Sequence, residues 1–342
     1  MTLGVSVLTA KFSCSGSLFP SMTNRPQEQS HTVARSIMSS SIKPLAQYKR
    51  EPARISFQLT DRDVEILKAL NRYRYMRTGQ VHELLFSENG ALQSARRRLR
   101  NLYHHRYIAR AQPYVQVGKP KPEITYFLDQ KGRQVLRDHG EVVRHWRKGN
   151  EVKYLFLEHA LALTTFRIKL EKAVAAIEGA TLDRFIPDFD MRAEAENYVG
   201  LKRYTLYREV INPANRKTYI VHPDALIELT ISRDGKSATR LIFVEIDQGT
   251  QGLERIRDKL TGYHLYHEQK LFEQFGPFSS FLLLFQAPSQ RRADAIFNGL
   301  LDHVGAPLVR VAAAAELSVE SILTRPVWKD MKGEMKSVVL QK

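Results

Sequence analysis

Residues 89–108 read NGALQSARRRLRNLYHHRYI, and this stretch decides how the first half of the chain folds. It carries five arginines and no acid, and Arg110 lies just beyond it. At 100° per residue, one side of a helix collects the apolar residues Leu92, Ala95, Leu99, Leu102 and Tyr103. The opposite side and its flanks hold the polar residues Gln93, Ser94, Arg96, Arg97, Arg98, Arg100 and Asn101. We therefore predict an amphipathic helix with a cationic face.

The polar groups of this helix are those that contact phosphates and base edges in a DNA major groove. The alternative is a solvated basic face on a structural helix. The charge distribution favours a DNA-contacting face over a solvated one, because the excess of positive charge lies in the half that contains this helix. Residues 1–150 hold 26 Lys/Arg against 11 Asp/Glu, whereas residues 151–342 hold 26 against 25. A membrane-surface patch is less favoured, because no amphipathic apolar anchor accompanies the charge.

The segments around the cationic helix complete a recognisable module. Thr60 and Asp63 predict a capping box that starts one helix, and Thr78 predicts the start of a second, short helix. After the cationic helix, two β-rich runs flank the sequence GKPKP at 118–122, which predicts a hairpin. Three helices and a hairpin are typical of a winged helix-turn-helix, and Lys119 and Lys121 at the tip are expected to reach DNA phosphate. A winged helix that binds protein is the alternative.

The order of helices and strands expected in the second half of the chain predicts a mixed sheet with helices on both faces. The whole chain is therefore expected to be α/β (mixed α+β). A long helix is expected from Tyr154 to Ile177. The elements expected after it are strands at 181–186, 204–211, 218–231, 240–247, 278–286 and 308–312, with helices at 251–275 and 289–303. The expected divisions are a disordered tail (1–54), the winged helix (55–140), the α/β domain (151–315) and a C-terminal tail (316–342).

Carboxylates gather on two neighbouring strands of this predicted sheet. Asp224 is expected on one strand and Glu245 and Asp247 on the next, where they share a face, and a turn at 233–236 would bring the strands together. Such carboxylates suit Mg²⁺ or Mn²⁺, and a bound ion can stabilise charge on a phosphodiester. The alternative is a structural role, in which Glu245 and Asp247 bind backbone amides or pair with Lys259 or a nearby arginine.

Several runs resemble the replication-relaxation family, DNA-binding proteins of bacterial plasmids and integrated mobile elements. These runs are LTDRDVEILKALNRYRYMRTGQVHELLF (59–86), RRRLRNLY (96–103), YFLDQKGRQVL (126–136) and EIDQGTQGLERIRDKLTGYHLY (245–266). With His159, the resemblance spans about residues 57–312. It implies a protein that binds double-stranded DNA in replication control, maintenance or transfer of such an element, with replication or conjugation proteins or a second copy of the chain as further partners.

The order αβββαβ, with Pro223-Asp224 followed by Glu245-Ile246-Asp247, resembles the PD-(D/E)XK nuclease fold. This resemblance implies that Asp224, Glu245 and Asp247 are catalytic or bind metal, and that Glu158 is a further acidic candidate. Asp247 stands where the motif has lysine, so either Lys259 from the following helix takes that role or Asp247 is a third metal ligand. We expect a degenerate nuclease fold more than an active one.

Three readings of function thus stay open. They are a DNA-binding protein whose second domain is inert, a metal-dependent endonuclease targeted by its winged helix, and a transcriptional regulator whose second domain dimerises. The single cysteine, Cys14, excludes an internal disulfide framework and fits a reducing cytoplasm. No apolar run reaches the roughly 18 residues of a membrane span.

Overall fold

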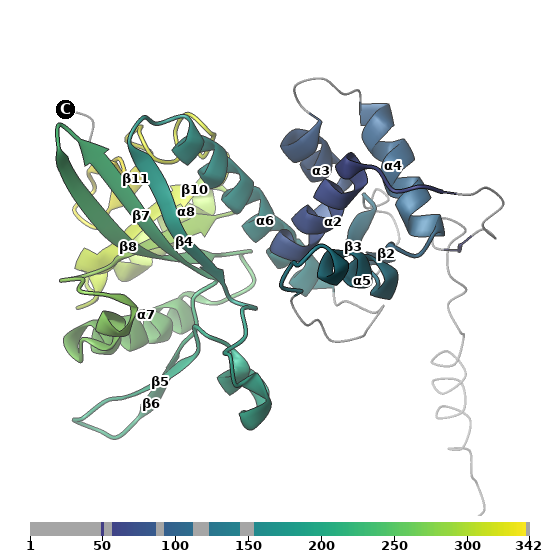
Figure 1. The fold of residues 1–342 in the computed structure, drawn as a ribbon. Helices are drawn as coiled ribbons and strands as arrows, with labels where there is room; N and C mark the ends of the chain where they lie inside the picture. Colours follow the sequence, from purple (N-terminus) through teal and green to yellow (C-terminus); the bar gives the residue numbers. More distant parts are fainter. Residues whose placement is uncertain (1–48, 51–56, 87–91, 112–122, 144–153, 340–342) are drawn as a thin grey trace, which may run out of the picture. The chain divides into compact units, whose positions relative to one another are not determined.

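The computed structural model describes residues 49–50, 57–86, 92–111, 123–143 and 154–339 (Figure 1). Its first part contains helices α2 (Asp61–Tyr73), α3 (Thr78–Leu85), α4 (Leu92–His104) and α5 (Gln130–Asp138). A small antiparallel sheet of order β1-β3-β2 joins them, made of β1 (Met76–Arg77), β2 (Ile108–Ala111) and β3 (Thr125–Leu128). Three helices followed by a β2–β3 hairpin give the predicted winged helix. Lys119 and Lys121 of the predicted wing tip lie outside the described residues.

Local sequence signals explain where these helices begin and which face they bury. The predicted capping box is confirmed, because the Thr60 backbone N–H and hydroxyl both donate to Asp63 Oδ2, at 2.9 and 2.8 Å. On α4, Ala95, Leu99, Leu102 and Tyr103 are buried as the helical period predicts. They pack against buried α2 side chains such as Leu67 and Leu70 to form the core of the winged helix.

The second part is built on a seven-stranded sheet of order β12-β11-β10-β9-β8-β7-β4. Its helices are α6 (Tyr154–Ala175), α7 (Leu253–Glu268) and α8 (Gln290–Leu300). Its strands are β4 (Ala180–Pro187), β7 (Ala225–Arg233), β8 (Lys236–Ile246), β9 (Leu282–Ala287), β10 (Val309–Ala313), β11 (Trp328–Asp330) and β12 (Met335–Lys336). β8, β9 and β10 run parallel and the other neighbours antiparallel, so the predicted mixed sheet and its αβββαβ order are confirmed.

Side chains of the central strands alternate between two apolar layers. Ile242 and Val244 of β8 pack in the layer that contains Phe166 and Leu170 of α6. Phe243 lies in the layer that contains buried residues of α7 and α8. Strands covered on both faces read as continuous apolar runs, as LIFV does at 241–244. The alternation also decides the direction of Glu245, which shares the α7 face with Phe243.

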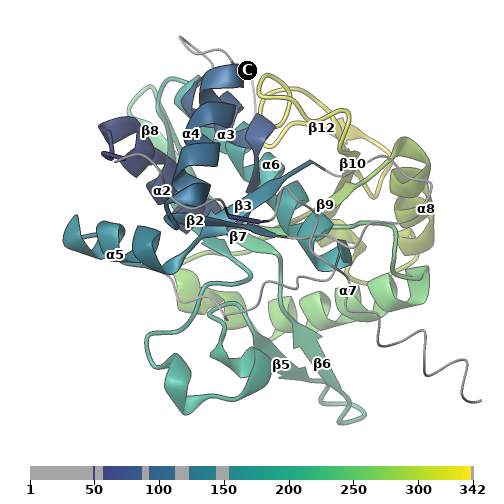
Figure 2. The same cartoon turned by 90° about the vertical axis from the view of Figure 1, so that its right-hand side faces the viewer.

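Two sequence predictions for this part are wrong. The single strand predicted at 218–231 is two strands, because β6 (Thr218–Val221) pairs with β5 (Arg208–Ile211) in a separate two-stranded sheet (Figure 2). Asp224 therefore lies just before β7 and not within a strand. The predicted C-terminal tail is also wrong, since β11 and β12 join the large sheet and Trp328 is fully buried there. None of the described helices combines the length and apolar composition needed to cross a membrane.

Trp328 tests whether the last strands are part of the folded domain. Its indole N–H donates to the Ile322 carbonyl oxygen at 2.9 Å, and its ring is buried in the α6 layer. We expect Trp328→Ala to lower the free energy of unfolding by about 3–5 kcal/mol, because it leaves a cavity in that layer. Urea unfolding measures the change. Met335→Ala, at a half-exposed position of β12, serves as the control and should cost far less.

Candidate functional site

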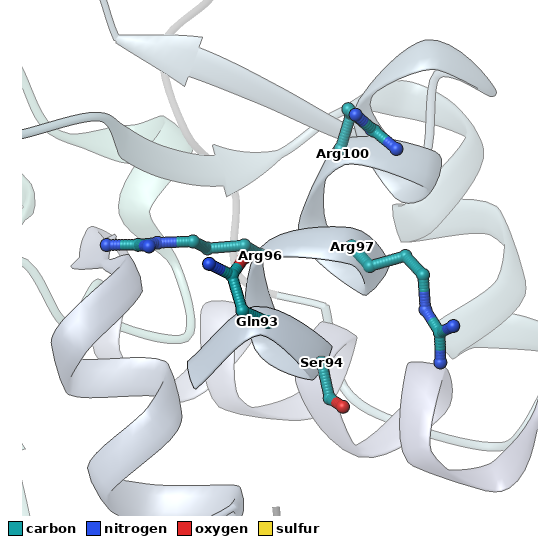
Figure 3. A pocket seen from close by; sticks show the side chains of 5 residues that line it. All are labelled: Gln93, Ser94, Arg96, Arg97 and Arg100. Atoms are coloured by element: carbon teal, nitrogen blue, oxygen red, sulfur yellow. The ribbon is translucent and has the colours of Figure 1, made fainter. Parts of the chain in front are cut away.

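The exposed face of α4 is the first candidate site (Figure 3). Gln93, Ser94, Arg96, Arg97 and Arg100 line a surface hollow of about 480 Å³, with Arg96 and Arg97 directed to opposite sides of the helix. All five belong to the polar face predicted from the sequence. Three guanidinium groups around one hollow, with no acid among its five lining residues, form a surface suited to phosphate oxygens and base edges.

Two further residues of the predicted face do not line this hollow. Arg98 turns toward the protein, where its Nη1 lies 3.2 Å from Oδ2 of the fully buried Asp63. Arg98 thus helps hold α4 against the start of α2. Asn101 is half-buried, and its backbone carbonyl oxygen lies 2.9 Å from Nδ1 of His105. A DNA contact by either residue stays a prediction.

The second candidate site surrounds Glu245, at the end of β8. Glu245 is only 3% exposed. Its Oε2 accepts from Lys259 Nζ at 2.6 Å, and its Oε1 accepts from the Tyr263 hydroxyl at 2.5 Å. Burial raises the pKa of Glu245 to about 7, although the Lys259 ammonium opposes the rise. Lys259 on α7 therefore occupies the position that the sequence left open for a relocated lysine.

Asp224 lies beside Glu245, because β7 and β8 pair with Ala225 opposite Val244. Its Oδ2 accepts from the backbone N–H of Ile246 at 2.6 Å and lies 3.1 Å from Nε2 of His159 on α6. Burial acts to raise the pKa of Asp224, but the cations of His159 and Lys259 hold it below its usual range. Burial acts to lower the pKa of His159, because it disfavours the charged imidazolium. The negative charge of Asp224 outweighs this effect and raises the pKa of His159 to about 9.

Asp188 completes this cluster and was missed by sequence reasoning. Its backbone N–H donates to the Asp224 carbonyl oxygen at 2.8 Å, and its own carbonyl oxygen lies 3.0 Å from Nε2 of His222. Burial, followed by the charge of Asp224, raises the pKa of Asp188 to about 7. Strand pairing places it there: Pro187 pairs with Ala225, so the residues just beyond this pair, Asp188 and Asp224, are adjacent. The spacing along the sequence did not indicate this pairing.

The other two acidic candidates are placed elsewhere. Asp247 forms an ion pair with Arg292 of α8, with an Nε to Oδ2 distance of 2.8 Å, and it accepts from the backbone N–H of Gly249. Glu158 forms an ion pair with Arg77 at 2.5 Å. Both carboxylates are thus held by arginines. The structure brings together Asp224, Glu245 and Lys259, but not Asp247 or Glu158.

The arrangement of donors around these carboxylates does not fit a divalent ion. Within the described residues, no group of three or more His, Cys, Asp or Glu side chains is arranged to hold a metal. Both oxygens of Glu245 already accept from Lys259 and Tyr263, and Asp224 lies against His159. Magnesium would first have to displace a cation that balances the buried charge. The residues present instead form two ion pairs, Glu245 with Lys259 and Asp224 with His159.

Comparisons with known proteins place most of this chain in one family. The family model described as replication-relaxation matches residues 67–277, well over half of the chain. No curated protein matches in sequence. Among solved structures, the chain is similar to the restriction endonuclease FokI, with a TM-score of 0.25 and 12% identity. That match covers 77% of this chain and 44% of the enzyme, so the chain spans less than half of it, and so weak a likeness supports no conclusion about activity.

The pairing of Lys259 with Glu245 predicts a pH-dependent cost of mutation. Because the folded-state pKa of Glu245 is raised, its contribution to stability is lost as pH rises through about 7. Lys259→Met removes the cation that opposes this shift, so its free energy of unfolding should fall below that of the parent by about 3–5 kcal/mol at pH 8, and by much less at pH 5.

Urea unfolding of the parent and Lys259→Met between pH 5 and 8 measures this difference. The control is the double variant Lys259→Met/Glu245→Gln, in which residue 245 can no longer ionise, so the extra pH dependence of Lys259→Met should disappear. Parallel profiles for Lys259→Met and the parent would show that the ion pair does not stabilise the site.

Proposed function

This chain belongs to the replication-relaxation family, and we propose that it binds double-stranded DNA in the replication control, maintenance or transfer of a bacterial plasmid or mobile element. The observation that carries the proposal is the cationic hollow on α4, the third helix of a winged helix. In helix-turn-helix proteins this helix enters the major groove with its N-terminal residues near base edges. Gln93, Ser94, Arg96 and Arg97 occupy that half of α4.

The chemistry of the hollow matches the two kinds of DNA contact. Arg97 can donate two hydrogen bonds to guanine, and Gln93 can pair with adenine through its amide. Arg96 and Arg100 add charge for the phosphates, which contribute affinity on any sequence. The excess of positive charge in residues 1–150 supports the same partner. Replication or conjugation proteins and a second copy of the chain are proposed as further partners, and the reducing cytoplasm as the compartment.

A second candidate function is endonuclease activity, favoured by the contact between Lys259 and Glu245. With Asp224 beside them, these residues have the acid, acid and lysine composition of the motif that the sequence only partly carries. Lys259 could offset negative charge that develops on a phosphodiester. Against this, its charge is already balanced by Glu245, and the donor set does not fit magnesium as arranged. We therefore favour DNA binding without efficient cleavage.

The DNA-binding proposal predicts a loss of discrimination when base contacts are removed. A good bidentate base contact discriminates by roughly 1–3 kcal/mol. Arg97→Ala and Asn101→Ala should therefore weaken binding to the cognate site, obtained by selection from random duplexes, more than binding to random duplex. Fluorescence anisotropy at fixed salt measures both affinities. Lys68→Ala is the control, because Lys68 pairs with Glu65 and Glu141.

Equal weakening on both duplexes would assign Arg97 and Asn101 to phosphate contacts. Unchanged binding of both variants would reject α4 as the recognition helix.

The acidic site predicts little response to divalent ions. Because Lys259 and His159 already balance its carboxylates, an excess of Mg²⁺ or Mn²⁺ should leave the thermal unfolding midpoint unchanged, and plasmid DNA should be cut weakly or not at all. A midpoint that rises in the parent but not in Asp224→Asn would establish a metal site. Cleavage that disappears in Lys259→Ala would then assign the enzyme function to this site.

A further inference from the structure

The winged helix carries a second cationic hollow, which shares no residue with the hollow on α4. It measures about 670 Å³ and lies where the end of α4 meets the start of α5. Its lining residues are Arg50, Arg106, Asp129, Gln130, Lys131, Gln134 and Arg137. Four of these seven side chains are cationic and one is acidic. None of the seven is among the residues expected from the sequence to contact DNA.

The one acid in this hollow is already neutralised. Asp129 Oδ2 lies 2.6 Å from Nη2 of Arg50, and its Oδ1 accepts from the backbone N–H of Gln130 at 2.7 Å. Arg50 and Asp129 therefore cancel, and the net charge of the hollow comes from Arg106, Lys131 and Arg137. Since a buried or paired cation attracts an external anion poorly, the state of these three residues decides what the hollow can bind.

The three remaining cationic residues, Arg106, Lys131 and Arg137, are exposed to solvent. Within the described part of the chain, none of them forms an ion pair. Arg137 donates only to the neutral Gln134 amide oxygen at 3.3 Å, and Lys131 Nζ lies 4.2 Å from the centre of the Tyr107 ring. Gln130 adds an amide donor to the same lining, whereas the amide nitrogen of Gln134 already donates to Asp138 Oδ1 at 2.8 Å. Cations with neutral donors between them suit a row of phosphate oxygens.

The position of Arg106 relates this hollow to the first one. Arg106 follows the last residue of α4 by two positions, whereas four of the five residues that line the first hollow lie in the N-terminal half of that helix. The 13 residues of α4 span about 20 Å at 1.5 Å per residue, more than the roughly 12 Å width of the major groove. A helix whose first turns lie in the groove therefore has its far end beside the phosphate backbone that borders it.

We propose that this second hollow binds the phosphate backbone of the same DNA duplex whose major groove receives α4. The inference rests on the DNA-binding function proposed above. Arg106, Lys131 and Arg137 contribute affinity without regard to base sequence, and they fix the angle at which α4 enters the groove. The C-terminal end of the recognition helix also contacts the DNA backbone in homeodomains.

The test is the salt dependence of DNA binding by the full chain. For duplex DNA, each phosphate contact contributes about 0.9 to the slope of log K against log salt concentration. The variant Arg106→Ala/Lys131→Ala/Arg137→Ala should therefore lower the slope by up to about 2.7. It should weaken binding to the selected site and to random duplex by the same factor. Arg97→Ala, by contrast, should change the ratio of the two affinities.

Two matched variants separate charge from fold. Arg106→Lys/Arg137→Lys keeps the positive charges and should keep the slope of the parent. Lys68→Ala removes one cation outside the hollow and should also leave the slope unchanged. If the triple alanine variant unfolds at a lower temperature than the parent, a further variant, Arg106→Lys/Lys131→Glu/Arg137→Lys, decides the question. Its only change of charge is at the exposed Lys131, and it should still reduce the slope.

The outcomes distinguish this inference from the function on which it rests. If the parent binds duplex DNA with a steep slope and the triple variant keeps that slope, the second contact is overturned while DNA binding stands. If the parent binds no duplex at low salt, the proposed function fails and the second contact fails with it. A reduced slope with an unchanged affinity ratio establishes the hollow as a backbone contact.

Discussion

The buried charge of Glu245 is the constraint on which the second part of the structure depends. A carboxylate taken out of water destabilises a fold unless donors satisfy both oxygens. Lys259 and Tyr263 supply them, and because they are four residues apart they share one face of α7. That pairing fixes which side of α7 faces β8. The same contacts that make the burial tolerable also occupy the carboxylate oxygens that a metal ion would need.

Helix α6 serves both parts of the described chain. Phe166 and Leu170 pack on the large sheet, whereas Ile168 is buried in the core of the winged helix. The Tyr73 hydroxyl donates to Glu171 on the same helix, and burial with the charge of Glu171 raises the pKa of Tyr73. A helix apolar on more than one side is expected to be buried by two partners. His159, which contacts Asp224, lies on this shared helix, so the acidic site and the part that contains α2 to α5 have one element in common.

The sequence by itself determined the local features of this protein. The spacing of Leu99 and Leu102 predicted the buried stripe of α4 and hence its cationic face, because helical period depends only on neighbouring residues. Thr60 and Asp63 predicted the start of α2 for the same reason, since a capping box spans four consecutive residues. The tight turn after Arg233 predicted the β7–β8 pairing that sets Asp224 beside Glu245. The fold class followed from the order of these elements.

Only the tertiary structure decided which charged groups meet. Arg98 reaches Asp63 across 35 positions, and Asp247 reaches Arg292 across 45. These contacts depend on how helices pack on one another and on the sheet, which no local spacing encodes. Strand order likewise placed Asp188 beside Asp224, and only pairing within the large sheet drew Trp328 into the core. The residue types at the acidic site were readable in the sequence, and Lys259 was among the partners that it offered. The sequence did not decide between these partners, because electrostatic pairing acts through space while sequence reasoning follows the chain.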